Sequence, residues 1–304
     1  MSFEVTILGS GAALPTSNRK PTSQYVNCNE RFILIDCGEG TQNQLRKYGI
    51  KFQRINHILI SHLHGDHFFG LIGLLSTMHL LGRDKGITIY GPKELEQIIR
   101  IQLEVGGSKI GFKIKFVILD NPEGGILFED RLLEIHYFPM NHRIPTNGFK
   151  IQEKPKERSI IGEEMKANNI SLKAIPFFRQ GLDFTDENGE IHYASQYSKA
   201  NKAPKSYAYC SDTSYFEPII PHIQNVDVLY HEATFIENMS VRAKETFHST
   251  AKQAAEIAMK ADVKKLLLGH LSARYGNGEA HLSEAQAVFQ NTEVVEDGNT
   301  YLVR

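Results

Sequence analysis

The sequence predicts an α/β protein in which strands and helices form a layered sandwich, and three observations favour this class. Short apolar runs bounded by Gly, Asp or Asn alternate with helical stretches through the first 150 residues, which is typical of buried strands and the helices between them. This pattern stops near residue 153, in a polar stretch, and returns from Tyr207. Two strand-rich halves with interspersed helices are what a layered α/β fold requires.

The individual elements follow from the apolar runs and from the residues that end them. The expected strands of the first half are Glu4–Leu8, Phe32–Ile35, Ile55–Ser61, Ile87–Tyr90, Phe116–Leu119, Leu132–Phe138 and Gly148–Ile151. Its expected helices are Gly38–Lys47, Gly65–Leu81 and Pro92–Glu104, the last with Pro at a first-turn position. The second half is expected to contain strands Tyr207–Ser211, Val226–Tyr230 and Lys264–Leu268 and helices Ser249–Ala261 and Leu282–Phe289.

Composition limits the class of protein. The chain has 304 residues, with 34 Lys and Arg against 35 Asp and Glu, so its charge excludes a strongly basic protein that coats nucleic acid by charge alone. Its three cysteines show no CxxC spacing, which predicts reduced thiols and a cytoplasmic location. The longest apolar stretch, Gly70–Gly82, contains polar residues and is too short to cross a bilayer, so no membrane partner is expected.

The strongest chemical signal is the segment Ser61–His67, which reads SHLHGDH and directly follows an expected strand. Alternation along an extended loop points His62 and His64 the same way, and Gly65 permits a turn that brings Asp66 and His67 to the same space. Such a cluster would be wasteful as packing, because every buried polar group needs a partner. Nitrogen and oxygen ligands without thiolates suit zinc or a similar divalent ion.

Four side chains in one segment cannot complete the coordination shells of two metal ions, so further ligands are expected at the ends of other strands. His142, Asp212 and His270 each lie just past an apolar run. An α/β sheet presents its site at that edge. Each of the three taken alone would more often be a structural residue, but their shared placement makes them candidate ligands.

The HxHxDH motif with later single His, Asp and His residues resembles the metallo-β-lactamase fold, a four-layer αββα sandwich with a two-metal site. Companion motifs narrow the resemblance to the ribonuclease Z family of tRNA 3′-processing endonucleases. They are Ile35–Gln42 (IDCGEGTQ), His231–Thr234 (HEAT), His248–Thr250 (HST) and Gly269–Tyr275 (GHLSARY). HxHxDH alone indicates only the superfamily, whereas its combination with HEAT and HST is specific.

The resemblance implies a cofactor and a reaction. His62, His64 and His142 would hold one zinc ion, Asp66, His67 and His270 would hold a second, and Asp212 would bridge both. Manganese and iron are alternatives to zinc, because nitrogen and carboxylate ligands bind all three metals. The implied reaction removes the 3′ trailer of precursor tRNA and leaves a 3′-hydroxyl on the tRNA and a 5′-phosphate on the trailer.

The resemblance also implies roles for residues around the metals. Asp66 would orient the attacking water or accept its proton. His248 would be the acid that protonates the leaving group, with Glu232 as its carboxylate partner. Arg274 and Ser272 closely follow a ligand and are expected to grip phosphate. Asp36 is expected to support the ligands without binding metal.

The polar stretch at about 153–205 stands where the family carries a flexible arm that grips tRNA away from the active site. We therefore expect one domain over residues 1–304 with this arm inserted. The usual Gly-Pro-rich turn of the arm is missing, because the chain reads NISLKAIPFFR from Asn169 to Arg179. The family further implies a homodimer in which the arm of one subunit serves the site of the other.

The loop Leu14–Lys20 (LPTSNRK) departs from relatives that refuse precursors already ending in CCA, which carry Pro-x-Lys-x-Arg-Asn there. This chain keeps Pro15 and Arg19 but has Ser17 for the Lys and Lys20 for the Asn. Arg19 is expected to contact the acceptor end through its guanidinium fork, with weaker discrimination against CCA. A plain surface turn is the alternative.

Two other functions remain open at the level of sequence. The first is a small-molecule ester or thioester hydrolase on the same fold, and the second is a catalytically inactive RNA-binding module. The arm favours tRNA, since a small substrate needs no distant grip. The complete set of candidate ligands together with His248 argues against an inactive module.

Overall fold

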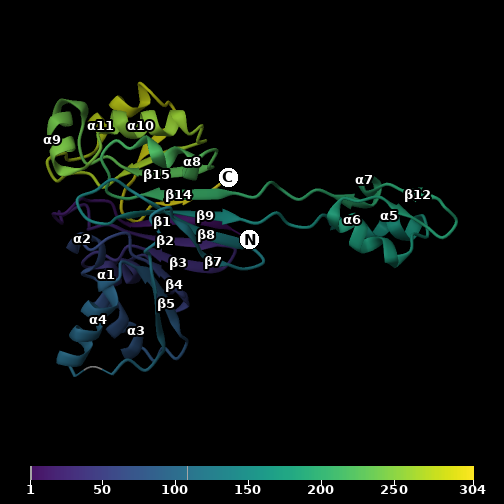
Figure 1. Ribbon diagram of the computed structural model, residues 1–304, viewed down its shortest axis with the longest axis horizontal. Coiled ribbons are helices and arrows are strands. Elements are labelled where there is room, and N and C mark those ends of the chain that lie inside the picture. The colour runs from purple at the N-terminus through teal and green to yellow at the C-terminus, as the bar shows by residue number, and fades with distance from the viewer. Residues whose placement is uncertain (1, 108) are drawn as a thin grey trace. The chain divides into compact units, whose positions relative to one another are not determined.

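The computed structural model describes residues 2–107 and 109–304, which divide into two compact units (Figure 1). The larger unit contains the chain up to Gln152 and from Lys205 onwards, and the smaller unit is Glu153–Pro204. The larger unit is built around two sheets.

Each sheet of the larger unit has seven strands among the described residues. In spatial order the first sheet contains β18 (Thr300–Leu302), β1 (Phe3–Gly9), β2 (Ser23–Cys28), β3 (Arg31–Ile35), β4 (His57–Leu59), β5 (Ile87–Gly91) and β6 (Ile114–Ile118). The second contains β17 (Thr292–Val294), β16 (Leu266–Gly269), β15 (Val228–Glu232), β14 (Ser206–Cys210), β9 (Asn147–Glu153), β8 (Leu133–Pro139) and β7 (Gly125–Glu129).

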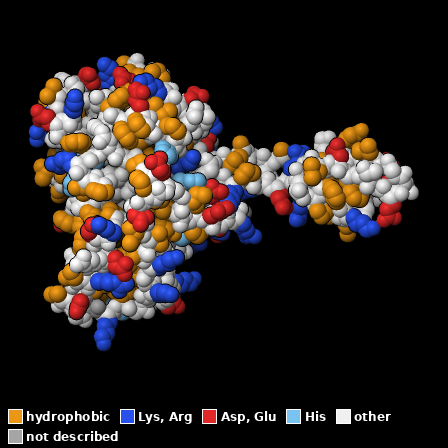
Figure 2. Space-filling model, in the orientation of Figure 1, with side chains coloured by type: hydrophobic (Ala, Val, Ile, Leu, Met, Phe, Trp, Pro, Cys, Tyr) orange, Lys and Arg blue, Asp and Glu red, His pale blue; other side chains and the backbone are white. Residues whose placement is uncertain are grey.

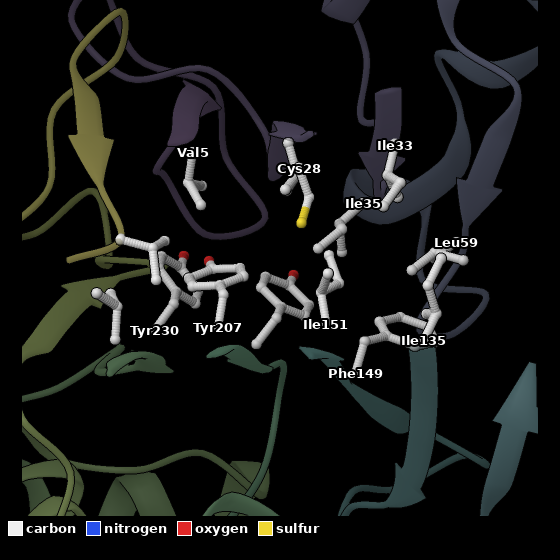
Figure 3. Close-up of a cluster of buried hydrophobic side chains, with 14 of the residues drawn as sticks. Val5, Cys28, Ile33, Ile35, Leu59, Ile135, Phe149, Ile151, Tyr207 and Tyr230 are labelled. Atoms are coloured by element: carbon white, nitrogen blue, oxygen red, sulfur yellow. The ribbon is translucent and has the colours of Figure 1, made fainter. Parts of the chain in front are cut away.

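The main core lies between the two sheets, where inward side chains of both meet (Figure 3). Val5 and Ile35 of the first sheet and Ile151 and Tyr207 of the second are fully buried there. Burying this apolar surface is the main favourable term that holds the sheets face to face. The sandwich expected from the sequence is therefore confirmed.

Helices cover the outer face of each sheet and complete the αββα layering. On the first sheet they are α1 (Thr41–Lys47), α2 (Gly65–Phe68), α3 (Leu71–Leu80) and α4 (Glu94–Val105). On the second they are α8 (Ile220–Ile223), α10 (Ala251–Lys260) and α11 (Glu279–Gln286). The helix α9 (Ser240–Thr246) precedes α10 in the chain. The small Ala side chains of α10 let it pack closely on its sheet, with Ala254 and Ala258 fully buried.

Strand direction determines where functional side chains can meet. Strands β14, β15 and β16 are parallel neighbours, with Tyr207 opposite Val228 and Leu229 opposite Leu266. In the other sheet β3 and β4 are also parallel, with Ile33 opposite His57. The carboxyl ends of parallel strands share one edge of a sheet, so loops that follow them can build a common site.

The structure contains strands that the apolar runs do not predict. The strands β2, β7, β17 and β18 were not expected. Strand β2 reads SQYVNC, and its Gln24 is fully buried, with the side-chain oxygen accepting a hydrogen bond from the Tyr207 hydroxyl across the core. A polar residue whose partner is distant in the chain gives no local signal of burial.

The helix expected over Gly65–Leu81 is divided into α2 and α3 at Gly70. The Gly70 amide donates to the Cys37 carbonyl at 2.9 Å, so the helical segment packs directly on the loop after β3. A Cβ at Gly70 would lie 2.1 Å from the Gly38 carbonyl oxygen. This close approach fixes α2 against the strand ends.

The smaller unit contains several short elements although its sequence predicts none. They are β10 (Ser159–Ile160), α5 (Gly162–Ala167), α6 (Ile175–Gln180), β11 (Phe184–Thr185), β12 (Ile191–His192), α7 (Ala194–Tyr197) and β13 (Ser198–Lys199). A separate core of Met165, Phe178 and Tyr197 holds them together. Asn169, two residues after the end of α5, lies in the left-handed region (φ 53°), a conformation that Asn tolerates, and the 3-10 turn Leu172–Ala174 then leads into α6.

We predict that Gly70→Ala destabilises the larger unit by about 1–3 kcal/mol, the usual cost of overpacking. The added methyl group must displace the Gly38 backbone, which has no free space to move into. Thermal unfolding of the purified protein measures the effect. Gly276→Ala is the matched control, because a Cβ at Gly276 would meet nothing within 4 Å. Equal unfolding temperatures for Gly70→Ala and the control would contradict this packing argument.

Candidate metal centre

The first group of candidate ligands combines the His-rich segment after β4 with two loops of the second sheet. His62 Nε2 lies 3.0 Å from His64 Nδ1, which lies 3.2 Å from His142 Nε2. Asp212 Oδ2 is 3.6 Å from His62 Nε2. The ligand atoms of these four residues all lie within 4.8 Å of one another, close enough to share one ion.

A second group lies beside the first. His67 Nε2 is 3.5 Å from Asp66 Oδ2, and His270 Nε2 is 3.4 Å from the same oxygen. Asp212 Oδ1 is 3.3 Å from both His67 Nε2 and His270 Nε2. The two oxygens of Asp212 therefore face different groups, which is the geometry that a carboxylate bridging two ions needs. The structure brings all seven candidate ligands together.

Unpaired polar atoms test whether a metal fits this cluster. Among the described residues, His67 Nε2 and Asp212 Oδ1 are buried without a hydrogen-bond partner, although they face each other. Buried polar atoms left unpaired are costly, and a cation between these two would satisfy both. Imidazole and carboxylate donors suit zinc and similar divalent ions. The clusters can thus bind a divalent metal.

The electrostatics of the cluster also favour a positive charge at its centre. Burial alone would lower the pKa of His67, but the carboxylates of Asp212, Asp66 and Asp36 outweigh burial and hold this pKa well above its usual value. Burial would raise the pKa of Asp212, yet His270 and His67 hold it well below the usual range. Without metal the ionised carboxylates of Asp66 and Asp212 favour a proton on His67, which a divalent ion would replace.

Partners behind the ligands fix how the imidazole rings are oriented. The ring nitrogen that faces away from the cluster is bonded in each of four histidines: His62 Nδ1 to Ser61 Oγ (3.0 Å), His67 Nδ1 to Asp36 Oδ2 (2.8 Å), His142 Nδ1 to Phe247 O (2.9 Å) and His270 Nδ1 to Thr234 Oγ1 (2.9 Å). Such bonds select the tautomer whose other nitrogen is free for a metal.

Among these partners, Asp36 accepts several hydrogen bonds at once. Its fully buried carboxylate accepts the Ser61 amide at 2.7 Å and the Ser61 hydroxyl at 2.9 Å. It also accepts the Tyr209 hydroxyl at 2.6 Å and faces His67 Nδ1 at 2.8 Å. Asp36 faces His67 through Nδ1, the ring nitrogen that points away from the cluster, and so supports this ligand from behind.

The pair of Glu232 and His248 stands beside the second group. Glu232 is fully buried, and its Oε1 lies 3.0 Å from His248 Nδ1. Burial alone would lower the pKa of His248, but this carboxylate outweighs burial and raises the pKa to about 9. Among the described residues the hydrogen bonds of the ring involve Nδ1, so Nε2 is the nitrogen available to a substrate. The pair is arranged as a cationic acid held by a carboxylate.

The cluster opens into a cavity of about 710 Å³, whose wall includes Asp66, His248 and His270. Ser272 and Arg274 also line it, and Arg274 Nη1 donates to Ser272 Oγ at 3.2 Å. Arg274 lies over the Phe235 ring at 5.8 Å, which orients its guanidinium. These two residues therefore lie where a phosphate in the cavity could reach them.

The structure does not bring Arg19 into this cavity. The residue is only 7% exposed, and its Nη1 donates to Ser10 Oγ at 2.6 Å and to the Val295 carbonyl at 2.7 Å. The guanidinium thus ties the loop Leu14–Lys20 to the end of the second sheet instead of facing the metal cluster. Sequence reasoning missed this because both acceptors depend on tertiary folding, and one is 276 positions away in the chain.

Sequence reasoning also left three residues of the site unassigned. Thr234 Oγ1 donates to Glu232 at 2.8 Å and lies 3.2 Å from His248 Nδ1, in addition to its contact with His270. Its place in the HEAT motif was the available signal. Arg143 and Arg242 line the metal cavity. For Arg143 the signal was its position directly after a candidate ligand, whereas Arg242 on α9 gave none.

Comparison with solved structures defines the fold class. The crystal structure of human tRNase Z, short form (ELAC1), superimposes with a TM-score of 0.73 at 29% identity and covers 99% of each chain. The metallo-β-lactamase fold protein YhfI from Bacillus subtilis gives a TM-score of 0.69 at 19% identity over 99% of this chain and all of its own. The chain therefore has the metallo-β-lactamase fold, as the motif resemblance implied.

Comparison with curated sequences defines the family. Ribonuclease Z of Parabacteroides distasonis is 47% identical over 97% of each chain, and ribonuclease Z of Phocaeicola vulgatus is 46% identical over 95% of this chain and 94% of its own. The chain belongs to the ribonuclease Z family. A family model described as anti-Pycsar protein Apyc1 also matches residues 3–154. Within the described residues, every helix is too short or too polar to cross a membrane.

We predict that Asp36→Asn weakens divalent-metal binding by about 10–100-fold, the usual effect of losing a partner behind a ligand. An amide offers one acceptor oxygen, so some of the donors that now converge on Asp36 lose their partner. Chelator competition measures the change. Asp297→Asn is the matched control, because Asp297 also accepts two backbone amides, those of Ser10 and Lys20 at 3.0 and 2.8 Å, and neither donor is a candidate ligand. Equal metal affinities in the two variants would contradict the assigned role.

Proposed function

We propose that this chain is a metal-dependent endoribonuclease that removes the 3′ trailer of precursor tRNA. The cut would leave a 3′-hydroxyl on the tRNA and a 5′-phosphate on the trailer. The single observation that carries the proposal is the Asp212 carboxylate between two His-rich groups, with the Glu232–His248 pair beside them. Curated relatives named ribonuclease Z, similar over nearly their whole length, support the same activity.

The proposed cofactor is two zinc ions per chain, with manganese or iron as alternatives of the same ligand preference. His62, His64 and His142 would hold one ion, Asp66, His67 and His270 would hold the other, and Asp212 would bridge them. When bound, the ions would supply positive charge that polarises the scissile phosphate and stabilises charge developing on its oxygens. Nitrogen and oxygen donors at the observed spacing support this assignment.

The protein's own groups would position the reactants and transfer protons. Asp66 faces the cavity and would orient the attacking water and accept its proton. His248 Nε2 would donate a proton to the leaving 3′-oxygen, and Glu232 would keep the ring charged and correctly turned. Ser272 and Arg274 would bind the phosphate, the latter by its guanidinium fork. The cation-lined cavity favours a phosphodiester over a neutral thioester.

The smaller unit is proposed to be the tRNA-binding arm, inserted into a single domain that spans residues 1–304. Its surface displays large apolar and aromatic side chains beside a few cations (Figure 2). Phe177 is 43% exposed and Tyr193 is 52% exposed, although burial would be the usual state of such residues. Exposed aromatics can stack on unpaired bases or pack on a nucleic-acid surface. This surface would grip tRNA at a distance from the metals.

The proposed oligomeric state of the protein is a homodimer, and its proposed location is the cytoplasm. A homodimer would let the arm of one subunit serve the metal centre of its partner. The three cysteines are buried thiols outside any disulfide, which is compatible with the reducing cytoplasm, where tRNA matures. Arg19 would act on the acceptor end only indirectly, by holding the loop Leu14–Lys20 in place.

We predict that His248→Ala lowers the rate of precursor tRNA cleavage by about 10²–10⁴-fold, the usual loss for a positioned acid. Single-turnover cleavage of a precursor with a defined trailer measures the rate and maps the product ends. Metal content should be unchanged, because seven other residues are assigned as ligands. His248 also lies within ligand distance of Asp212 and His270, so loss of metal in this variant would make it a ligand instead. A wild-type enzyme that cleaves a thioester but no precursor would refute the proposed function.

We predict that deleting Lys156–Lys202 lowers kcat/KM for precursor tRNA by at least about tenfold and leaves hydrolysis of bis(p-nitrophenyl) phosphate within about twofold. Binding energy from a remote contact is available only to a substrate large enough to reach it. A short Gly/Ser linker can close the gap, because Gln152 and Ser206 are paired on adjacent strands. The salt dependence of tRNA cleavage should also fall. Equal losses for both substrates would make this segment structural.

A further inference from the structure

A second cavity borders the metal cavity and has no part in the function described so far. It has a volume of about 500 Å³, and His248 lines both cavities. Its other walls include Asn141, Ser214, Tyr215 and Lys244. We call this space the side cavity. Its wall is formed by the loops that carry His142 and Asp212 and by the start of α9.

Hydrogen bonds connect the wall of the side cavity to the loops of the metal cluster. Asn141 Nδ2 donates to Ser214 Oγ at 2.7 Å, and the Ser214 amide donates to the Asn141 carbonyl at 3.0 Å. These bonds join the loop that carries His142 to the loop that carries Asp212. The wall of the side cavity is therefore built from the same loops as the metal cluster.

Two further side chains give the side cavity an aromatic ring and a positive charge. The Tyr215 hydroxyl donates to Glu217 Oε1 at 2.7 Å and accepts from Lys260 Nζ at 2.8 Å, so this aromatic ring is held in place. Lys244 is exposed, and among the described residues no carboxylate lies within ion-pair distance of its ammonium. A fixed aromatic beside a free cation suits a ligand with a flat ring and a negative charge.

The shared position of His248 decides which part of the substrate could lie in the side cavity. In the proposed reaction the bond between phosphorus and the leaving 3′-oxygen breaks, and this oxygen takes a proton from His248. The leaving oxygen belongs to the last nucleotide of the tRNA, so the ribose of that nucleotide must lie within hydrogen-bond reach of His248. In the same reaction the scissile phosphate would lie among the candidate ligands and the arginines of the metal cavity.

We propose that the side cavity is the subsite for the last nucleotide of the tRNA body, the one that keeps the 3′-hydroxyl after cleavage. This inference rests on the proposed function. The cavity has the size of a small-ligand site. Tyr215 stacks on the base, the hydroxyl and amide groups of Ser214 and Asn141 contact its polar edge, and Lys244 binds the phosphate on the 5′ side of this nucleotide.

Two substitutions test the subsite, with a matched control for each. Ser240→Trp fills the side cavity from the start of α9, and Lys244→Ala removes its free cation. Ser283→Trp adds the same ring at an exposed position of α11, and Lys51→Ala removes an exposed lysine elsewhere. The probe is adenosine 5′-monophosphate, titrated into each metal-loaded protein. We expect at least about tenfold weaker binding in Ser240→Trp and about threefold to tenfold in Lys244→Ala, with rescue by Lys244→Arg and control affinities within about twofold.

Precursor cleavage provides the second measurement. In Ser240→Trp the value of kcat/KM should fall at least about tenfold further for precursor tRNA than for bis(p-nitrophenyl) phosphate, which has no nucleotide on its leaving group. Equal losses for both substrates, or nucleotide binding unchanged by Ser240→Trp, would overturn the inference. If wild type binds the nucleotide in a Ser240-sensitive way but leaves precursor tRNA uncut, the side cavity is a nucleotide site and the proposed function is wrong.

Discussion

The carboxylate of Asp36 accepts hydrogen bonds from Ser61 at the end of β4 and from Tyr209 on β14, and it faces His67 on α2. It therefore joins both sheets to the His-rich segment at the edge where the candidate ligands meet. Asp36 itself adopts a left-handed conformation (φ 55°), which Asp and Asn tolerate better than other residues with a side chain. The hydrogen bonds around Asp36 hold His67 with its Nε2 facing the second group of ligands.

A metal ion that neutralises the buried carboxylates would stabilise the fold as well as take part in the chemistry. Asp36, Asp66 and Asp212 bring carboxylates into a largely buried space, where an isolated charge would be costly. Histidines compensate only in part, since burial lowers the pKa of His62 and His142 and keeps these rings neutral. A divalent ion would complete the balance, and ligands that bind only the folded chain stabilise it. A bound divalent ion would also attract the negatively charged phosphodiester.

The sequence predicts most of what depends on short-range pattern. The strands before His62, Asp212 and His270 are continuous apolar runs, so their ends, and therefore the candidate ligands, could be located. What depends on partners distant in the chain could not be predicted. Burial of Gln24 in β2 needs Tyr207, the break at Gly70 needs the loop after β3, and the inward turn of Arg19 needs Val295. The short helices of the smaller unit also give no signal, because each is less than two turns long.

Anomalous X-ray scattering from crystals of the purified, metal-loaded protein tests the central claim most directly. Data collected on either side of the absorption edge of the bound element reveal the number and position of the ions. Two anomalous peaks per chain are expected, one among His62, His64 and His142 and one among Asp66, His67 and His270, with an oxygen of Asp212 beside each. A single peak, no peak, or a peak coordinated by His248 in place of one of these ligands would contradict the central claim.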